Sequence, residues 1–131
     1  MYSKKVITIF IFSFCLFGCI FSFSQKRAEK IREEKILEDW KSDTLGCFGY
    51  RNSEKACYLR DSLGLMNKSK AFVLKKIGVP NFTQKNDDDE VFKYYFNGIC
   101  REGVLIDSAD YCWLELLIIS DKVEYIGISC Y

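Results

Sequence analysis

The chain has 131 residues, enough for one domain. Its 19 basic and 18 acidic side chains leave a formal net charge of +1, so no strong field steers it toward nucleic acid or an acidic partner. The chain contains no histidine. This excludes Ser-His-Asp and Cys-His nucleophilic catalysis, histidine-ligated metals and the usual general base near neutral pH.

The N-terminus has the plan of an export signal. Residues 6–23 carry no charge, two lysines precede them, and Lys26 and Arg27 follow. A positive start, an apolar core and then small residues are typical of a secretory signal. We therefore predict an export segment over residues 1–24. The rest of the chain would lie in the periplasm or at the outer membrane, or alternatively be secreted.

Three fates of this segment fit the sequence. Residues 22–24 (SFS) put serine at the last and third-last positions before a cut, as signal peptidase requires. Residues 16–19 (LFGC) resemble a lipobox, which would end the signal at residue 18 and make Cys19 the lipidated first residue of a lipoprotein. Left uncut, the 18 residues could anchor the chain, because they can just span a bilayer with about 30 Å of hydrocarbon.

Five of the seven cysteines lie beyond this segment, namely Cys47, Cys57, Cys100, Cys112 and Cys130. Such a density predicts disulfide bonds in an oxidising compartment, with at most two bridges among five thiols. Their separation favours Cys100–Cys112 across a loop between neighbouring strands. Cys47–Cys57 is a second choice, and Cys130 could replace a partner in either bridge. Alternatively, several are small buried hydrophobic residues.

Helical patterns come next in the chain. Residues 26–41 mix many charges with a sparse apolar stripe, which predicts an exposed helix inside a linker over residues 25–45. It would dock at most through Leu37 and Trp40. Two shorter helices follow, each with an N-cap residue and a glycine stop. The caps are Asn52 or Ser53 and then Asn67 or Ser69, and the stops are Gly64 and Gly78.

Beyond Glu90 the period of the sequence becomes strand-like. Strands are predicted over residues 91–96, 113–119 and 123–128, joined by local connections. Such strands form an antiparallel meander, and one face must be covered because small isolated sheets are marginal. The fold class is therefore α+β, with two short helices packed on a three-stranded sheet over residues 46–131. The export segment and the charged helix precede it.

The first strand is rich in aromatic residues. Alternation along a strand places Phe92, Tyr94 and Phe96 on one face, which we interpret as the core face beneath the helices. Other aromatic side chains could form an exposed face for a protein partner. These candidates are Tyr95, Tyr125 and Tyr131.

One segment of the sequence resembles a pattern found in a known family. Residues 75–81 (KKIGVPN), an acidic loop and residues 92–95 (FKYY) are similar to the "leucine-glycine-x-proline, then aromatic strand" pattern of BamE/SmpA-like outer-membrane lipoproteins. The order of two helices and three antiparallel strands is similar to that of the family. The chain is also similar to the repeat unit of the β-lactamase-inhibitor-protein-like fold. The resemblance covers residues 50–131. It implies a fold, an envelope location and a role in outer-membrane assembly or maintenance.

No cofactor or metal is expected. No two cysteines beyond the leader stand within a few residues of each other, as a zinc site usually needs, and residues 86–90 lack the ligand spacing of an EF-hand. We expect a non-catalytic envelope protein that binds another protein, with a secreted inhibitor or ligand-binding module as the alternative. A small hydrolase with paired carboxylates is a third hypothesis. Its candidate residues are Glu102, Asp107, Asp110 and Glu115.

Overall fold

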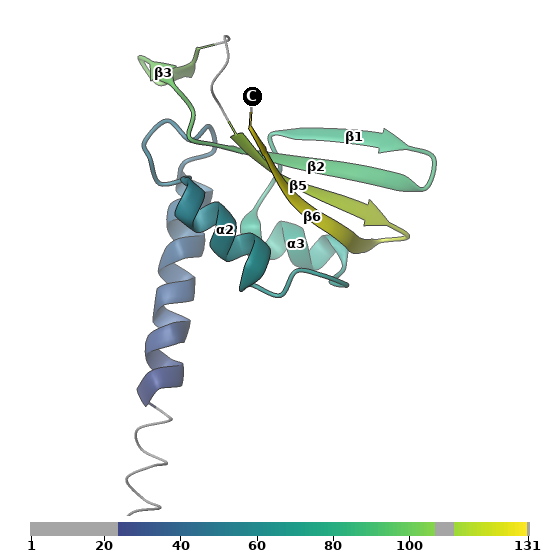
Figure 1. Cartoon of the computed structure of the whole chain (residues 1–131), viewed down its shortest axis with the longest axis horizontal. Coiled ribbons are helices and arrows are strands. Elements are labelled where there is room, and N and C mark those ends of the chain that lie inside the picture. Colours follow the sequence, from purple (N-terminus) through teal and green to yellow (C-terminus); the bar gives the residue numbers. More distant parts are fainter. Residues whose placement is uncertain (1–23, 107–111, 131) are drawn as a thin grey trace, which may run out of the picture. The chain divides into compact units, whose positions relative to one another are not determined.

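The computed structural model describes residues 24–106 and 112–130 (Figure 1). Cys19, Asp107, Asp110 and Tyr131, all singled out by the sequence, lie outside the described residues. The chain divides into two compact units, Met1–Lys35 and Ile36–Tyr131. In the first, the described residues 24–35 are helical and almost all exposed. Lys30 and Glu34 form an ion pair across one helical turn, with nitrogen and oxygen 4.0 Å apart.

The second unit is an α+β domain built on a four-stranded antiparallel sheet. The strands are β1 (Phe82–Asn86), β2 (Asp89–Phe96), β5 (Cys112–Ile119) and β6 (Lys122–Cys130), in the order β1-β2-β5-β6. The sheet therefore has two edges, β1 and β6, at opposite sides (Figure 1). A separate two-stranded ribbon joins β3 (Cys100–Arg101) to β4 (Val104–Leu105).

The prediction of a three-stranded sheet is wrong by one strand. Residues 82–86, which the sequence suggests to be part of a polar loop, pair with β2 over their whole length. All five side chains of β1 are exposed, so the strand has no buried apolar row to reveal it. Asp87 and Asp88 form the turn of a tight hairpin, closed by the pair Asn86 and Asp89. The acidic stretch is therefore a turn between two strands.

The described residues contain three helical segments. A helical segment over residues 24–42 precedes α2 (Ser53–Asp61) and α3 (Lys70–Ile77). Both short helices start as predicted. The Asn52 side chain accepts a hydrogen bond from the Lys55 N–H at 3.0 Å, and the Ser69 hydroxyl accepts one from the Phe72 N–H at 3.2 Å. At the end of α3, Gly78 adopts φ +89°, which only glycine reaches without strain.

The core lies between the helices and one face of the sheet. Phe92, Tyr94 and Phe96 of β2 are buried there, which confirms the predicted core face. The last turns of the helix ending at residue 42 contribute Leu37 and Trp40 to the same core, so the compact unit begins before residue 46. The other core side chains come from α2, α3, β5, β6 and the loop before α3. They include Ala56, Leu59, Leu65, Val73, Ile77, Leu114, Leu116, Ile118 and Val123.

Candidate protein-binding surface

Two disulfide bonds join four of the five described cysteines. Neither is a favoured pairing, although Cys130 replaces Cys100 as the partner of Cys112, an alternative that the sequence left open. Cys47 is bonded to Cys100, with α-carbons 5.4 Å apart, and Cys112 to Cys130, with α-carbons 4.1 Å apart. Cys57, on α2, is exposed and has no disulfide partner among the described residues. The pairings Cys100–Cys112 and Cys47–Cys57 are therefore wrong. Cys100 starts a ribbon outside the main sheet and bonds to the loop before α2, whereas Cys112 faces Cys130 on the neighbouring strand.

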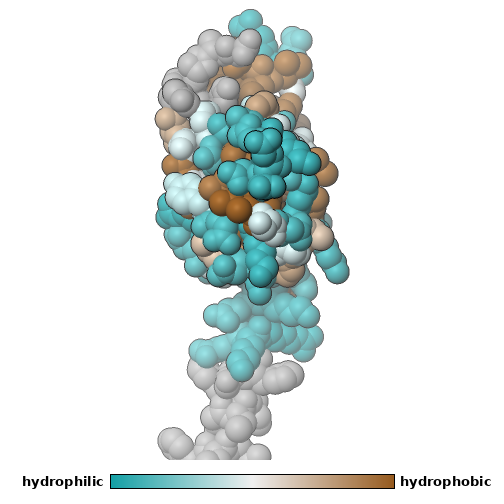
Figure 2. Space-filling view, turned by 90° about the vertical axis from the view of Figure 1, so that its right-hand side faces the viewer, coloured by the Kyte–Doolittle hydropathy of each residue, from teal (hydrophilic) through white to brown (hydrophobic). Residues whose placement is uncertain are grey.

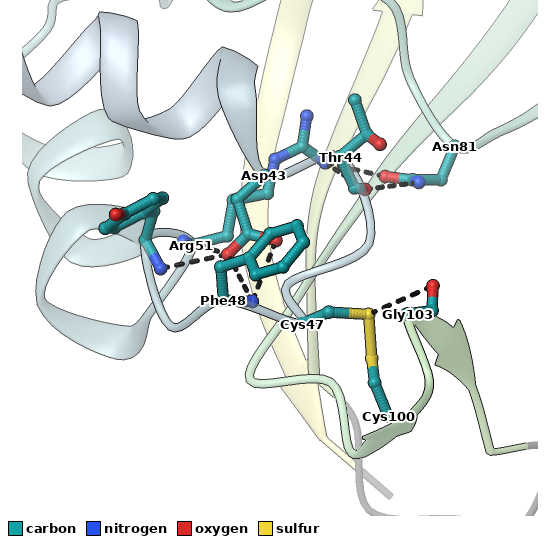
Figure 3. Close-up of a disulfide and its surroundings, with 9 residues drawn as sticks. Asp43, Thr44, Cys47, Phe48, Arg51, Asn81, Cys100 and Gly103 are labelled. Carbon is teal, nitrogen blue, oxygen red and sulfur yellow. Dashed lines mark hydrogen bonds between the residues drawn. A yellow bond between two sulfur atoms is a disulfide. The ribbon is translucent and has the colours of Figure 1, made fainter.

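The loop of residues 43–51, which we call the anchored loop, is organised around a buried carboxylate (Figure 3). Asp43 accepts hydrogen bonds from the backbone N–H groups of Phe48, Tyr50 and Arg51, the shortest at 2.9 Å. A single side chain thus satisfies three donors of a segment with no regular structure. This fixes the path of the loop, because unpaired backbone groups at a buried site cost free energy.

Arg51 ties the same loop to the rest of the domain. Its side chain is buried, and it donates to the carbonyls of Trp40 at 2.7 Å and Thr44 at 2.8 Å. It also donates to the Asn81 side-chain oxygen at 2.8 Å, just before β1 (Figure 3). The guanidinium lies 4.9 Å from the centre of the Trp40 ring. Residues 40–44 and Asn81, which are distant from each other in sequence, therefore meet at one cation.

Burial lowers the pKa of Arg51 to about 10, and the nearby Asp43 carboxylate partly opposes that shift. The guanidinium therefore stays protonated at neutral pH. Burial also raises the pKa of Tyr94, whose hydroxyl donates to the Gly78 carbonyl at 2.9 Å. These groups sit inside the packed domain, and we interpret the shifts as consequences of structural burial.

Two glycines let the anchored loop approach the end of β2. A β-carbon at Gly46 would lie 2.9 Å from the Phe96 α-carbon, and one at Gly98 would collide with the Leu45 carbonyl oxygen and the Leu105 side chain. The loop, the β2 end and the ribbon are therefore packed backbone to backbone at this point. The Cys47–Cys100 bond closes the same junction (Figure 3).

This junction yields a matched test of close packing. Gly46 and Gly49 both have positive φ, +70° and +75°, but a β-carbon at Gly49 would meet nothing within 4 Å. Gly49→Ala should therefore cost only the left-handed backbone strain, about 1–2 kcal/mol of unfolding free energy. Gly46→Ala adds a backbone clash and should cost about 1–3 kcal/mol more. Equal losses in urea denaturation would show that the packing at Gly46 is loose.

The ribbon exposes apolar side chains on its outer face. Cys100 and Leu105 pair across the ribbon and are half-buried toward the anchored loop. The residues alternating with them point the other way, and Ile106 N–H donates to the Ile99 carbonyl at 2.8 Å, which extends the pairing. Ile99, Val104 and Ile106 are 55 %, 68 % and 41 % exposed. We call these three residues the ribbon face, and the exposed side chain of Arg101, which pairs with Val104, lies on the same side of the ribbon.

The ribbon face is held in place by contacts with the rest of the domain. An isolated pair of two-residue strands is not stable in water. Here the Cys47–Cys100 bond and the Gly46–Gly98 approach fix it to the domain. Figure 2 looks onto the β1–β2 and β5–β6 turns, a side that is mostly hydrophilic, and shows apolar side chains higher up, level with β3 in Figure 1. Exposed apolar side chains on a fixed element are typical of an interaction surface.

The tyrosines predicted to bind a partner lie elsewhere. Tyr95 and Tyr125 belong to the sheet face opposite the core, on β2 and β6, with β5 between them. Tyr95 is half-buried, and its backbone N–H donates to the Asn81 side chain at 2.9 Å. Tyr125 is 53 % exposed. An ion pair of Lys93 and Glu115, at 3.4 Å, lies on the same face, which we call the open face.

The carboxylates proposed for hydrolysis are not brought together where the structure describes them. Glu102 is exposed at the turn of the ribbon, and Glu115 lies on the open face beside Lys93. Among residues 24–106 and 112–130, no group of three Cys, Asp or Glu side chains could hold a metal ion.

Sequence reasoning missed the ribbon, although a signal was present. Residues 99–106 read ICREGVLI, with apolar residues on both sides of Glu102-Gly103. Both turn residues have positive φ, +52° and +78°, as a two-residue hairpin turn of type I′ requires. Such a turn, flanked by apolar residues, predicts a hairpin.

Comparison with known proteins gave no match: no protein-family model, no curated protein and no solved structure matches this chain.

Proposed function

We propose that this protein is an exported, non-catalytic component of the cell envelope that acts by binding another protein. The observation that carries the proposal is the ribbon face. The domain uses a disulfide bond and a close glycine contact to hold Ile99, Val104 and Ile106 in solvent. Such an arrangement offers a preformed apolar contact, because a fixed surface loses little conformational entropy on binding.

Two observations support the location. The leader has the composition of an export signal. Two disulfide bonds in one small domain are typical of proteins that fold in an oxidising compartment. In the described part of the chain, no helix is long and apolar enough to cross a membrane. Attachment, on this proposal, is through a lipidated Cys19 or the uncut leader, and the resemblance to BamE/SmpA-like lipoproteins favours work in outer-membrane assembly or maintenance.

The second candidate is a secreted inhibitor or ligand-binding module that acts after release. The same ribbon face would serve it, since a preformed apolar protrusion also suits insertion into a partner's cleft. The two candidates differ in attachment. An envelope component stays with the membrane fraction, whereas an inhibitor is recovered outside the cell.

Capture from detergent-solubilised envelope tests the binding surface. Val104→Ser and Val79→Ser form a matched pair, because both valines are strongly exposed, at 68 % and 78 %, but only Val104 belongs to the ribbon face. With tagged protein, we expect Val104→Ser to reduce recovery of the partner about tenfold, as loss of a central apolar contact usually does. Val79→Ser should capture as much as wild type.

A third variant examines the other surface. Tyr125→Ala changes the open face and leaves the ribbon intact. We expect it to capture the partner normally. Loss of capture by Tyr125→Ala with full capture by Val104→Ser would move the binding site to the open face. If wild type recovers no protein above the untagged background, the proposal fails.

A further inference from the structure

The outer edge of β6 is a strand-pairing site that the chain itself occupies only in part. β6 is the last strand of the order β1-β2-β5-β6, so β5 pairs with one side of it alone. At its start, the segment before α3 covers the outer side. Val123 N–H donates to the Lys68 carbonyl at 3.0 Å, and the Val123 carbonyl accepts from the Asn67 N–H at 2.9 Å.

Beyond this point the edge is open. Within residues 24–106 and 112–130, no backbone hydrogen bond reaches the outer side of β6 after Val123. We call residues 124–130 the β6 edge. Solvent reaches much of it, since four of its residues are exposed and two are half-buried, while Gly127 is buried against the Tyr125 ring.

The register shows which backbone groups point outward. The α-carbons of Cys112 and Cys130 are 4.1 Å apart, which marks a non-hydrogen-bonded pair of an antiparallel ladder. Ile128 and Ile126 lie opposite Leu114 and Leu116 at the same kind of position. The N–H and C=O groups of Ile126, Ile128 and Cys130 therefore face away from β5. Val123 behaves in the same way, as its bonds to residues 67 and 68 show.

Beyond the register irregularity at Glu124, the β6 edge lacks the devices that normally prevent strands from pairing. Its single charge is Glu124, and it contains no lysine and no proline. The other edge, β1, carries Lys85 and ends beside an acidic turn. The Cys112–Cys130 bond also fixes the far end of β6 to β5, where the last strand of a domain would otherwise fray. The edge is therefore open, uncharged over most of its length and held in place.

We infer that β6 pairs antiparallel with β6 of a second copy of this chain, about a two-fold axis at Gly127. That axis places Ile126 opposite Ile128 of the second copy, twice, and Gly127 opposite its own equivalent. Both isoleucines are half-buried against the core, so the pairing completes the burial of an apolar row. Glu124 comes to lie opposite an uncharged cysteine, and no like charges face each other along the edge.

The geometry favours a second copy through this self-complementarity. An axis perpendicular to the sheet makes the two sheets continuous and leaves both helical layers on one side. A contact limited to one strand edge is small beside a standard interface, so the dimer is weak, with a Kd on the order of 100 μM. This inference concerns β6 and is independent of the ribbon face.

Sedimentation equilibrium of the exported protein over a concentration series tests the inference. We expect a reversible monomer–dimer equilibrium for wild type. Ile128→Lys places a charge in the proposed interface, where the long side chain can reach solvent in the monomer, and should weaken dimerisation at least tenfold. Ile119→Lys is the matched control, because Ile119 is also half-buried but lies on β5, away from the edge. It should dimerise as wild type does.

Backbone hydrogen exchange adds a readout that does not depend on a variant's folding. The amides of Ile126 and Ile128 should exchange more slowly as wild-type concentration rises, while those of β1 stay unchanged. A protein that remains monomeric up to about 1 mM overturns the inference. So does a dimer that Ile128→Lys leaves intact, or one in which the β6 amides gain no protection.

Discussion

Replacing Arg51 with methionine should destabilise the domain by about 3–5 kcal/mol, measured by urea denaturation. The variant keeps a long apolar stem but removes the donors to the buried carbonyls of Trp40 and Thr44. It also leaves the buried Asp43 carboxylate without its neighbouring cation. Unpaired polar groups and an uncompensated charge would then remain inside the domain, which is the costly way to break such a network.

Arg60→Met is the matched control. Arg60 is exposed on α2 and pairs with its neighbour Asp61 at 2.6 Å. That pair is surrounded by water, so its loss should leave stability nearly unchanged. If Arg51→Met also unfolds at the wild-type urea concentration, the network around Arg51 does not organise the anchored loop.

Loss of each disulfide bond should lower the free energy of unfolding by a different amount. Cys47–Cys100 closes a separation of 53 residues, and Cys112–Cys130 one of 18. If a disulfide stabilises mainly by restricting the unfolded chain, replacing both cysteines by serine should cost about 4 kcal/mol at the first bond and about 3 kcal/mol at the second. A Cys57→Ser background prevents the exposed thiol from forming wrong pairs during refolding.

The same two variants separate stability from binding. At a temperature where both are folded, loss of Cys47–Cys100 frees the ribbon and should abolish partner capture. Loss of Cys112–Cys130 leaves the ribbon face in place and should preserve capture. Equal capture by both variants would show that the disulfide-anchored geometry is irrelevant to binding.

Much of the fold can be predicted from local chemistry. Asn52 and Ser69 cap the two short helices because their side chains replace the missing acceptors of the first turn. The alternation of Phe92, Tyr94 and Phe96 gives the core face of β2, and it holds because the helices cover that face alone. Strong periodicity and cap chemistry need no knowledge of the tertiary structure.

The edge strand could not be predicted in this way. β1 buries none of its five side chains, so tertiary pairing with β2 determines its conformation. A half-buried strand can be predicted from its alternating apolar residues, whereas a fully exposed edge strand has no such alternation. Only the aspartates of the turn between β1 and β2 indicated a hairpin.

The disulfide pairing depends on a register that sequence separation does not reveal. Ser120 and Asp121 form the β5–β6 turn with φ of +48° and +66°, which pairs Ile119 with Lys122. Counted from that turn alone, Cys112 would face residue 129. The irregularity between Leu117 and Ile118 shifts the register by one residue and brings Cys112 opposite Cys130. A bulge of this kind is set by packing across the whole sheet.

The position of the ribbon face could not be predicted from the sequence. A protein-binding surface is what the composition favours, since the chain lacks histidine and clustered ligands. Tyr95 and Tyr125, two of the tyrosines proposed for it, lie on the open face, whereas the ribbon face arises where Cys47 and Cys100 meet across 53 residues. A local sequence pattern cannot predict long-range contacts of this kind.

An envelope location and two stable disulfide bonds both require export into a compartment where thiols are oxidised. Intact-mass spectrometry of the protein from its native cells, before and after reduction, tests this directly. We predict a chain without its leader, one carrying acyl chains on Cys19, or a full-length chain in the membrane fraction, and in each case the mass rises by two hydrogens for each of the two bridges on reduction. A full-length chain recovered from the cytoplasm, with every cysteine alkylated before any reductant is added, would contradict it.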